Sequence, residues 1–176
     1  MPYSAKLTTR ELVLLGLLLA AAVILRLMEN ILPFPIQIPG ARLGLANSVT
    51  IIALLLFGTR RTALLLLARL LLVGVISTGL LSPGFLIGLG GAACSFAAMA
   101  LAIRTGLFSP VGIGVTGACA HNCGQLLAAM LLLQSTAPAA YLPLLLVIAI
   151  PTGFSTGLIA RLVLPVLRRE NQNRQQ

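Results

Sequence analysis

The chain has 176 residues, of which 59% are hydrophobic and only 9% are charged, whereas a soluble domain carries about 25% charged residues. This composition excludes an ordinary soluble protein and predicts one integral membrane domain, residues 1–176, embedded in a lipid bilayer. The net charge of +9 does not indicate a nucleic-acid partner, because two tyrosines and no tryptophan leave no basic stripe interleaved with aromatic side chains.

Six apolar runs predict six transmembrane helices packed in one all-α bundle. Prolines close the first run, and Gly58 closes the second, so that residues 59–61, Thr-Arg-Arg, are expected to form a tight basic turn. Residues 33–43 are expected to be an irregular, proline-rich connector, and three prolines are expected to interrupt the last run. The predicted spans cover about residues 12–32, 44–58, 62–81, 85–103, 111–134 and 141–167.

The basic residues fall on alternate connectors of this six-span arrangement. Among the loops of one side only Arg42 is basic. Because cytoplasmic loops carry an excess of Lys and Arg, both termini are expected in the cytoplasm of a multi-pass protein of the inner (cytoplasmic) membrane. The basic residues of the other, cytoplasmic side are Lys6, Arg10, Arg60, Arg61, Arg104, Arg168, Arg169 and Arg174.

Residues that usually carry enzyme or metal chemistry are scarce. The chain has three acidic residues and no aspartate, so it lacks the clustered carboxylates that hold Mg²⁺, and it has no G-x-x-x-x-G-K-[ST] phosphate loop. Its three cysteines lie in predicted spans without a C-x-x-C spacing, which favours buried, inert thiols over disulfides or a metal site. We therefore expect no enzymatic activity, no ATP hydrolysis, no metal and no cofactor.

The stretch 117–125 places the only histidine of the chain in the middle of an apolar run. His121 and Gln125 are one helical turn apart and share a face, with Asn122 beside them. Polar groups at membrane depth must face protein or a water-filled cavity. Two interpretations stay open: the small and polar residues join neighbouring helices, or they bind a solute.

Further polar residues lie at the outward ends of the predicted spans. Together they predict a pocket that opens outward under residues 33–43, with a positive balance that suits a ligand bearing an anionic group. Alternatively, Arg26 and Glu29 form a closed pair and Arg42 faces water, which would leave an apolar pocket for an isoprenoid-like ligand. The predicted substrate-binding residues are Arg26, Glu29, Arg42, Asn47, Arg69, His121, Asn122 and Gln125.

Three expectations concern single residues and spacings. Arg69 lies about 10 Å deep at 1.5 Å per residue, and we expect it to pair with polar groups in the bundle rather than to extend to the cytoplasm. The small-residue spacings Gly16–Ala20 and Gly153–Gly157 suit helix docking, and Gly16 and Ala20 are the candidate docking stripe for a partner. Hydroxyl groups expected to bond to their own helices are those of Ser95, Thr152, Ser155 and Thr156.

Two motifs resemble those of a known family. Arg42-Leu-Gly-Leu-Ala-Asn-Ser-Val-Thr50 and Gly117-Ala-Cys-Ala-His-Asn-Cys-Gly-Gln125 are similar to stretches of the Gx transporter family, also called heptaprenyl diphosphate synthase component I. The similarity also includes Arg69 and residues 77–79, 90–95 and 151–153. The resemblance implies an architecture like that of the substrate-binding S components of energy-coupling-factor transporters, in which six helices hold a vitamin-like solute. It marks Arg42, Asn47, Arg69, His121 and Gln125 as motif positions without assigning their chemistry.

The function expected from these observations is a substrate-binding membrane component of an uptake transporter. Its solute would be small, vitamin- or precursor-like, and anionic if the pocket is as positive as the sequence indicates. Separate transmembrane and ATPase subunits would energise uptake. The alternative is a non-catalytic membrane subunit or scaffold for isoprenoid, quinone or electron-transfer enzymes.

Overall fold

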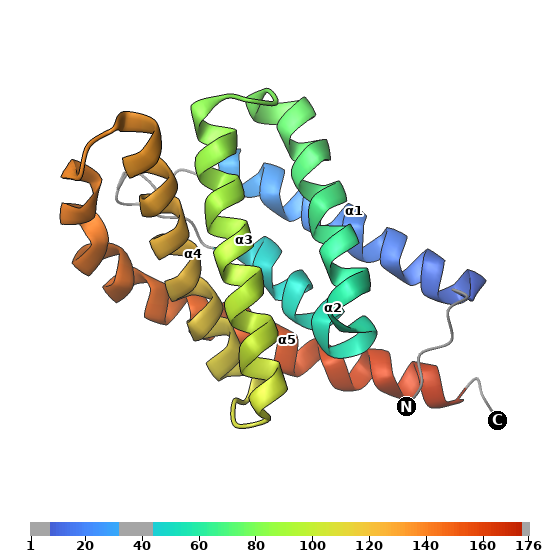
Figure 1. Cartoon of the computed structure of the whole chain (residues 1–176). Coiled ribbons are helices and arrows are strands. Elements are labelled where there is room, and N and C mark those ends of the chain that lie inside the picture. Colours follow the sequence, from blue (N-terminus) through green and yellow to red (C-terminus); the bar gives the residue numbers. More distant parts are fainter. Residues whose placement is uncertain (1–7, 32–43, 174–176) are drawn as a thin grey trace.

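The computed structural model describes residues 8–31 and 44–173, and every regular element in these two ranges is helical (Figure 1). The all-α prediction is confirmed for this part of the chain, whereas the connector 33–43 lies outside it. A π-helix, Gly74–Thr78, follows α2, and a 3-10 helix, Ala137–Tyr141, precedes α5. The five α-helices are α1 (Thr9–Ile31), α2 (Leu45–Val73), α3 (Pro83–Thr105), α4 (Pro110–Leu133) and α5 (Leu142–Asn173).

Five helical segments of the described residues are long and apolar enough to cross a membrane. The chain is therefore a multi-pass membrane protein. Six separate spans are not confirmed, because the predicted second and third spans form one helix, α2. The candidate spans are Thr9–Glu29, Leu45–Ser77, Pro83–Thr105, Pro110–Leu133 and Ala137–Leu167.

A single residue divides α2 into two arms. Gly58 has φ 75° and ψ 179°, a backbone conformation that glycine adopts readily because it lacks a Cβ atom. The predicted turn at residues 59–61 is wrong, since these residues are already helical and the chain changes direction at Gly58. Figure 1 shows the two arms running in different directions. Arg69 of the second arm donates a hydrogen bond to the carbonyl of Ala46 in the first, so the arms lie against each other.

An ion pair and a hydrogen bond join opposite ends of α1 to α2. Arg61, just after the kink in α2, pairs with Glu11 near the start of α1 at 2.7 Å. At the far end of α1, Glu29 accepts a hydrogen bond from the backbone N–H of Leu45, the first residue of α2. The first arm of α2 is thus antiparallel to α1, and the basic kink lies at the same end of the bundle as the start of α1.

The ends of α3 and α4 follow from local sequence. Ser82 and Ser109 each accept a hydrogen bond from a backbone N–H of the first turn, at 3.1 and 3.2 Å, and each is followed by a proline that needs no N–H partner there.

The predicted interruptions of the last span are wrong, because α5 is continuous through Pro151 and Pro165. It also extends beyond the predicted end at residue 167, to Asn173.

Glycines bring α4 and α5 into backbone contact. A Cβ atom built at Gly114 would collide with the carbonyl oxygen of Gly153, and one built at Gly157 would lie 2.5 Å from the Cα atom of Val111. The expected docking by Gly153 and Gly157 is therefore confirmed, and it occurs within the chain. In contrast, a Cβ atom at Gly16 would meet no described atom within 4 Å, so the stripe of Gly16 and Ala20 is not packed against the described residues.

An apolar core fills the bundle between all five α-helices. Its most buried large side chains include Ile51 and Met99. The three cysteines are free, as predicted, although their side chains are partly exposed rather than buried. The core cluster consists of Leu18, Ala22, Val49, Ile51, Ile52, Ala53, Leu54, Phe57, Leu65, Met99, Ala100, Ala102, Ile113 and Ala160.

The orientation in the membrane stays a prediction with a direct test. In a variant without the three native cysteines, a cysteine introduced at position 60 should react only with a reagent applied from the cytoplasmic side. A cysteine at position 138, between α4 and α5, should react from the outside, because it lies at the end of the bundle that carries few basic loops. Labelling of position 60 from outside, or of position 138 only from inside, would show the assignment to be reversed.

Candidate ligand-binding site

A cavity of about 70 Å³ lies among all five helices, at the end of α1 that is remote from Glu11. One water molecule needs roughly 10–15 Å³ on this measure, so the cavity can hold several waters or one small polar molecule. Asn47 of the predicted site lies on its wall, while Arg42 lies outside the described residues. The other predicted residues on the wall are Arg26, Glu29, Arg69, His121 and Asn122.

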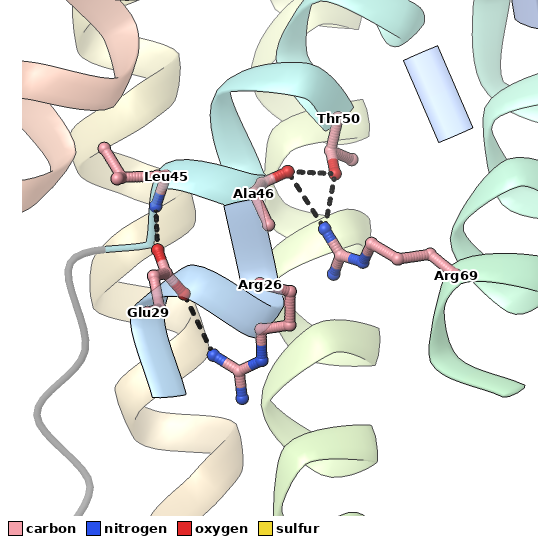
Figure 2. Close-up of polar contacts among 6 residues, drawn as sticks. All are labelled: Arg26, Glu29, Leu45, Ala46, Thr50 and Arg69. Atoms are coloured by element: carbon pink, nitrogen blue, oxygen red, sulfur yellow. Dashed lines mark hydrogen bonds and ion pairs between the residues drawn. The ribbon is translucent and has the colours of Figure 1, made fainter. Parts of the chain in front are cut away.

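The carboxylate of Glu29 is fully engaged by the protein, as Figure 2 shows. One of its oxygens binds the Arg26 guanidinium at 3.1 Å, and the other accepts the backbone N–H of Leu45. Gly44, the residue before α2, has a left-handed backbone and no side chain that could cap the helix, so Glu29 supplies the cap from α1. A carboxylate at a helix N-terminus is also favoured by the helix dipole. The pairing of Arg26 with Glu29 is confirmed, and it is one part of the alternative to a positive pocket; the other part, Arg42 facing water, lies outside the described residues.

Arg69 is 95% buried and is held by neutral groups (Figure 2). One terminal nitrogen donates to the carbonyl oxygen of Ala46 at 2.9 Å and to the hydroxyl of Thr50 at 3.4 Å. The prediction that Arg69 pairs within the bundle is confirmed. Among the described residues, no carboxylate forms an ion pair with it. A buried charge without a counter-ion is costly, so this part of the wall favours an anion.

The polar residues of α4 divide between two neighbouring helices. Asn122 donates to the backbone carbonyl of Leu145 at 2.7 Å and thereby joins α4 to α5. His121 and Gln125 share a face, as predicted, and both lie against Gly91 of α3. Nδ1 of His121 and Oε1 of Gln125 are buried and have no hydrogen-bond partner among the described residues. Asn122 thus joins α4 to α5, and the ring of His121 is hydrogen-bonded to the backbone of Gly91 in α3, whereas Nδ1 of His121 and Oε1 of Gln125 join nothing.

Ser95 is the residue that sequence reasoning placed wrongly. Thr152, Ser155 and Thr156 bond to carbonyls of their own helix, as expected. The hydroxyl of Ser95, however, is buried and has no partner among the described residues. Only the pairing of α3 with α4 shows that Ser95 faces Gly117, and no local pattern in α3 carries that information. Phe85 of α3 and the threonines Thr152 and Thr156 of α5 also line the cavity, and they were not predicted as site residues.

Comparison with known proteins places this site within a family. The model of the family described as heptaprenyl diphosphate synthase component I matches residues 18–163, a range that contains every residue lining the cavity. The chain belongs to this family. No curated protein and no solved structure matches the chain. In this member of the heptaprenyl diphosphate synthase component I family, the described residues hold no group of three His, Cys, Asp or Glu side chains that could bind a metal ion. The residues that line the cavity can offer a ligand charged groups and hydrogen bonds.

Proposed function

We propose that this protein is a membrane-embedded binding component for a small solute that carries an anionic group. The observation that carries the proposal is the buried guanidinium of Arg69 on the wall of a cavity among the five helices, bonded to neutral groups and to no described carboxylate. Charged groups at membrane depth are expensive and usually serve a substrate or ion pathway. The cost of burying Arg69 is explained if an anion from solution completes the site.

The balance of charge on the wall supports an anionic ligand. The wall carries two guanidinium groups, those of Arg26 and Arg69, and one carboxylate, that of Glu29. That carboxylate is already bonded by Arg26 and by the backbone N–H of Leu45. A planar guanidinium matches the geometry of a carboxylate or phosphate. The small volume suits a compact group rather than a long isoprenoid chain.

Uptake against a gradient would require energy from another chain. The sequence contains no phosphate-binding loop, so separate transmembrane and ATPase subunits would supply that energy. The face of α1 that carries Gly16 and Ala20 remains the candidate docking surface, since small residues let a partner helix approach closely. With both termini in the cytoplasm, such partners would act from the cytoplasmic side of the inner membrane.

The second candidate function is a non-catalytic membrane subunit of a prenyl-synthase assembly. The family name favours it, because a component I implies a further component. Catalysis by this chain itself has little support, since Glu11 and Glu29, the acidic side chains that the structure describes, are both in ion pairs. The two candidates differ in what co-purifies with the protein.

Ligand retention tests the binding function directly. Protein reconstituted gently into lipid nanodiscs should release a bound small anion on denaturation, which mass spectrometry can identify. Gly88 lines the cavity and a Cβ atom there meets no described atom within 4 Å, so Gly88→Phe should occupy the cavity and abolish retention. Gly16→Phe, which also meets no described atom, is the matched control and should retain the anion. The same small-molecule profile in wild type and Gly88→Phe would contradict the proposal.

Partner docking has a similar matched test. Gly16→Leu and Ala20→Leu together should abolish co-purification with coupling subunits while the protein stays inserted, because leucines would keep a partner helix at a distance. Ala93 and Ala97 have the same spacing on an exposed face of α3, and leucines there should have no effect. Unchanged co-purification with the α1 variant would exclude this face. A prenyl synthase as the captured partner would favour the second candidate function.

A further inference from the structure

Three buried polar atoms at the interface of α3 and α4 have no partner among the described residues. They are Oγ of Ser95, Nδ1 of His121 and Oε1 of Gln125. Ser95 is 1% exposed and Gln125 is 3% exposed, so bulk water does not satisfy these two side chains. We call these three side chains the polar recess.

The polar recess adjoins the cavity. Ala92 on α3 and His121 on α4 line the cavity. Ser95 lies one helical turn after Ala92 and Gln125 one turn after His121, and because α3 and α4 run in opposite directions these two side chains flank the ring of His121 on opposite sides. Gly91 allows both side chains of α4 to pack closely against α3: a Cβ atom there would lie 2.5 Å from Cγ of Gln125 and 2.9 Å from Cε1 of His121. The recess therefore lies at the closely packed interface of α3 and α4 and meets the cavity at His121.

Bonds between helices do not account for the three unpartnered atoms, although the ring of His121 is also hydrogen-bonded to the backbone of Gly91 in α3. Asn122, on the same helix as His121, shows what a joining residue does, since its amide bonds a carbonyl of α5 at 2.7 Å. A buried polar atom without a partner destabilises the fold, because it loses its bonds to water and gains none in return. Three such atoms beside one cavity indicate a group that enters from outside the chain.

We propose that the polar recess binds the hydrogen-bond-donating end of the ligand, a hydroxyl or amino group, while the anionic end of the same ligand meets Arg69. This inference rests on the anion-binding function proposed above. A carbonyl oxygen such as Oε1 of Gln125 can only accept, and the hydroxyl of Ser95 and a ring nitrogen of His121 can accept as well. The ligand class is therefore a small hydroxy- or amino-substituted carboxylate, or the corresponding phosphate.

The first arm of the test measures stability without ligand. Ser95→Ala and Gln125→Leu should leave the melting temperature unchanged or raise it, because each removes a polar atom that has no partner. Thr62→Val is the matched control: its hydroxyl is fully buried but bonded to the carbonyl of Gly58 at 2.8 Å, so its loss should lower the melting temperature. A loss of stability in both recess variants equal to that of the control would overturn the proposal.

The second arm measures binding of matched probes by titration calorimetry in nanodiscs. The pairs are glycolate or glycine with acetate, lactate or alanine with propionate, and 4-hydroxybutyrate with butyrate. In at least one pair the substituted probe should bind about tenfold more tightly, the ratio that one hydrogen bond of about 1.4 kcal/mol provides. Ser95→Ala and Gln125→Leu should remove that preference.

The outcomes separate this inference from the proposed function. Equal binding of substituted and unsubstituted probes by the wild type would overturn the polar recess and leave the anion site standing. The same holds if the preference survives in both recess variants. Binding of none of these probes, together with no retained anion in the nanodisc experiment, would overturn the proposed function and the recess with it.

Discussion

Replacing Arg69 with methionine should weaken binding of the retained anion between about 30-fold and several thousand-fold. Removing one partner of a buried charge-assisted bond costs about 2–5 kcal/mol, and each 1.4 kcal/mol is a factor of ten in affinity. Methionine keeps an unbranched apolar stem, so the wall of the cavity should retain its shape. Calorimetric titration of the anion into wild-type and Arg69→Met protein measures the effect.

Two variants serve as controls for this result. Arg69→Lys keeps the charge but loses the planar fork of donors, so we expect intermediate affinity. Arg104→Met removes a basic residue from the exposed C-terminal end of α3 and should bind as the wild type does. If Arg69→Met also binds as the wild type does, the charge of Arg69 is structural and the apolar-pocket alternative gains.

Replacing Gly114 with leucine should prevent stable folding. Extra methylene groups in a packed interior usually cost about 1–3 kcal/mol, where side chains can move aside. At Gly114 the atoms in the way are the backbone of Gly153 and Gly157, so α4 and α5 must separate, and we expect a loss beyond the upper end of that range. The measurement is thermal melting of purified protein in detergent, with insertion checked by extraction from membranes.

Gly16 offers the same substitution in open space. Gly16→Leu adds an identical side chain where no described atom lies within 4 Å, so the melting temperature of the isolated protein should not fall. Equal melting of Gly114→Leu and wild type would mean that the backbones of α4 and α5 are not in contact in the membrane. Equal losses in both variants would mean that leucine disfavours these helices irrespective of packing.

Features set by neighbouring residues were predictable from the sequence. Arg26 and Glu29 are three residues apart and share a helix face, so their ion pair follows from helical periodicity alone. The spacing of Gly153 and Gly157 likewise indicated close helix packing before the partner helix was known. The apolar runs predicted the helical class and, apart from α2, the approximate bounds of the helices.

Two errors arose where a local rule was overridden. Basic residues after Gly58 resembled a loop, yet one residue with positive φ turns the chain and the helix resumes at once. The prolines of the last span were expected to interrupt it, but transmembrane helices tolerate proline when neighbouring groups satisfy the freed carbonyls.

Distant contacts of the site were beyond sequence reasoning. Glu29 caps Leu45 although the two residues lie on either side of the connector 33–43. The hydrogen bond from Arg69 to Ala46 forms only because α2 changes direction at Gly58. The missing partner of Ser95 depends on how α3 and α4 align. These features require the three-dimensional pairing of helices, which no periodicity in a single helix records.

The short first arm of α2 has a consequence for synthesis. Residues 45–57 are helical over only about 20 Å at 1.5 Å per residue, whereas the hydrocarbon core is about 30 Å thick. This arm is held at its start by Glu29 of α1 and by Arg69 of the second arm. The translocon therefore cannot release it into lipid as an independent segment. We therefore expect it to enter the bilayer only after the ribosome has delivered the second arm, when both arms of α2 can pack against α1.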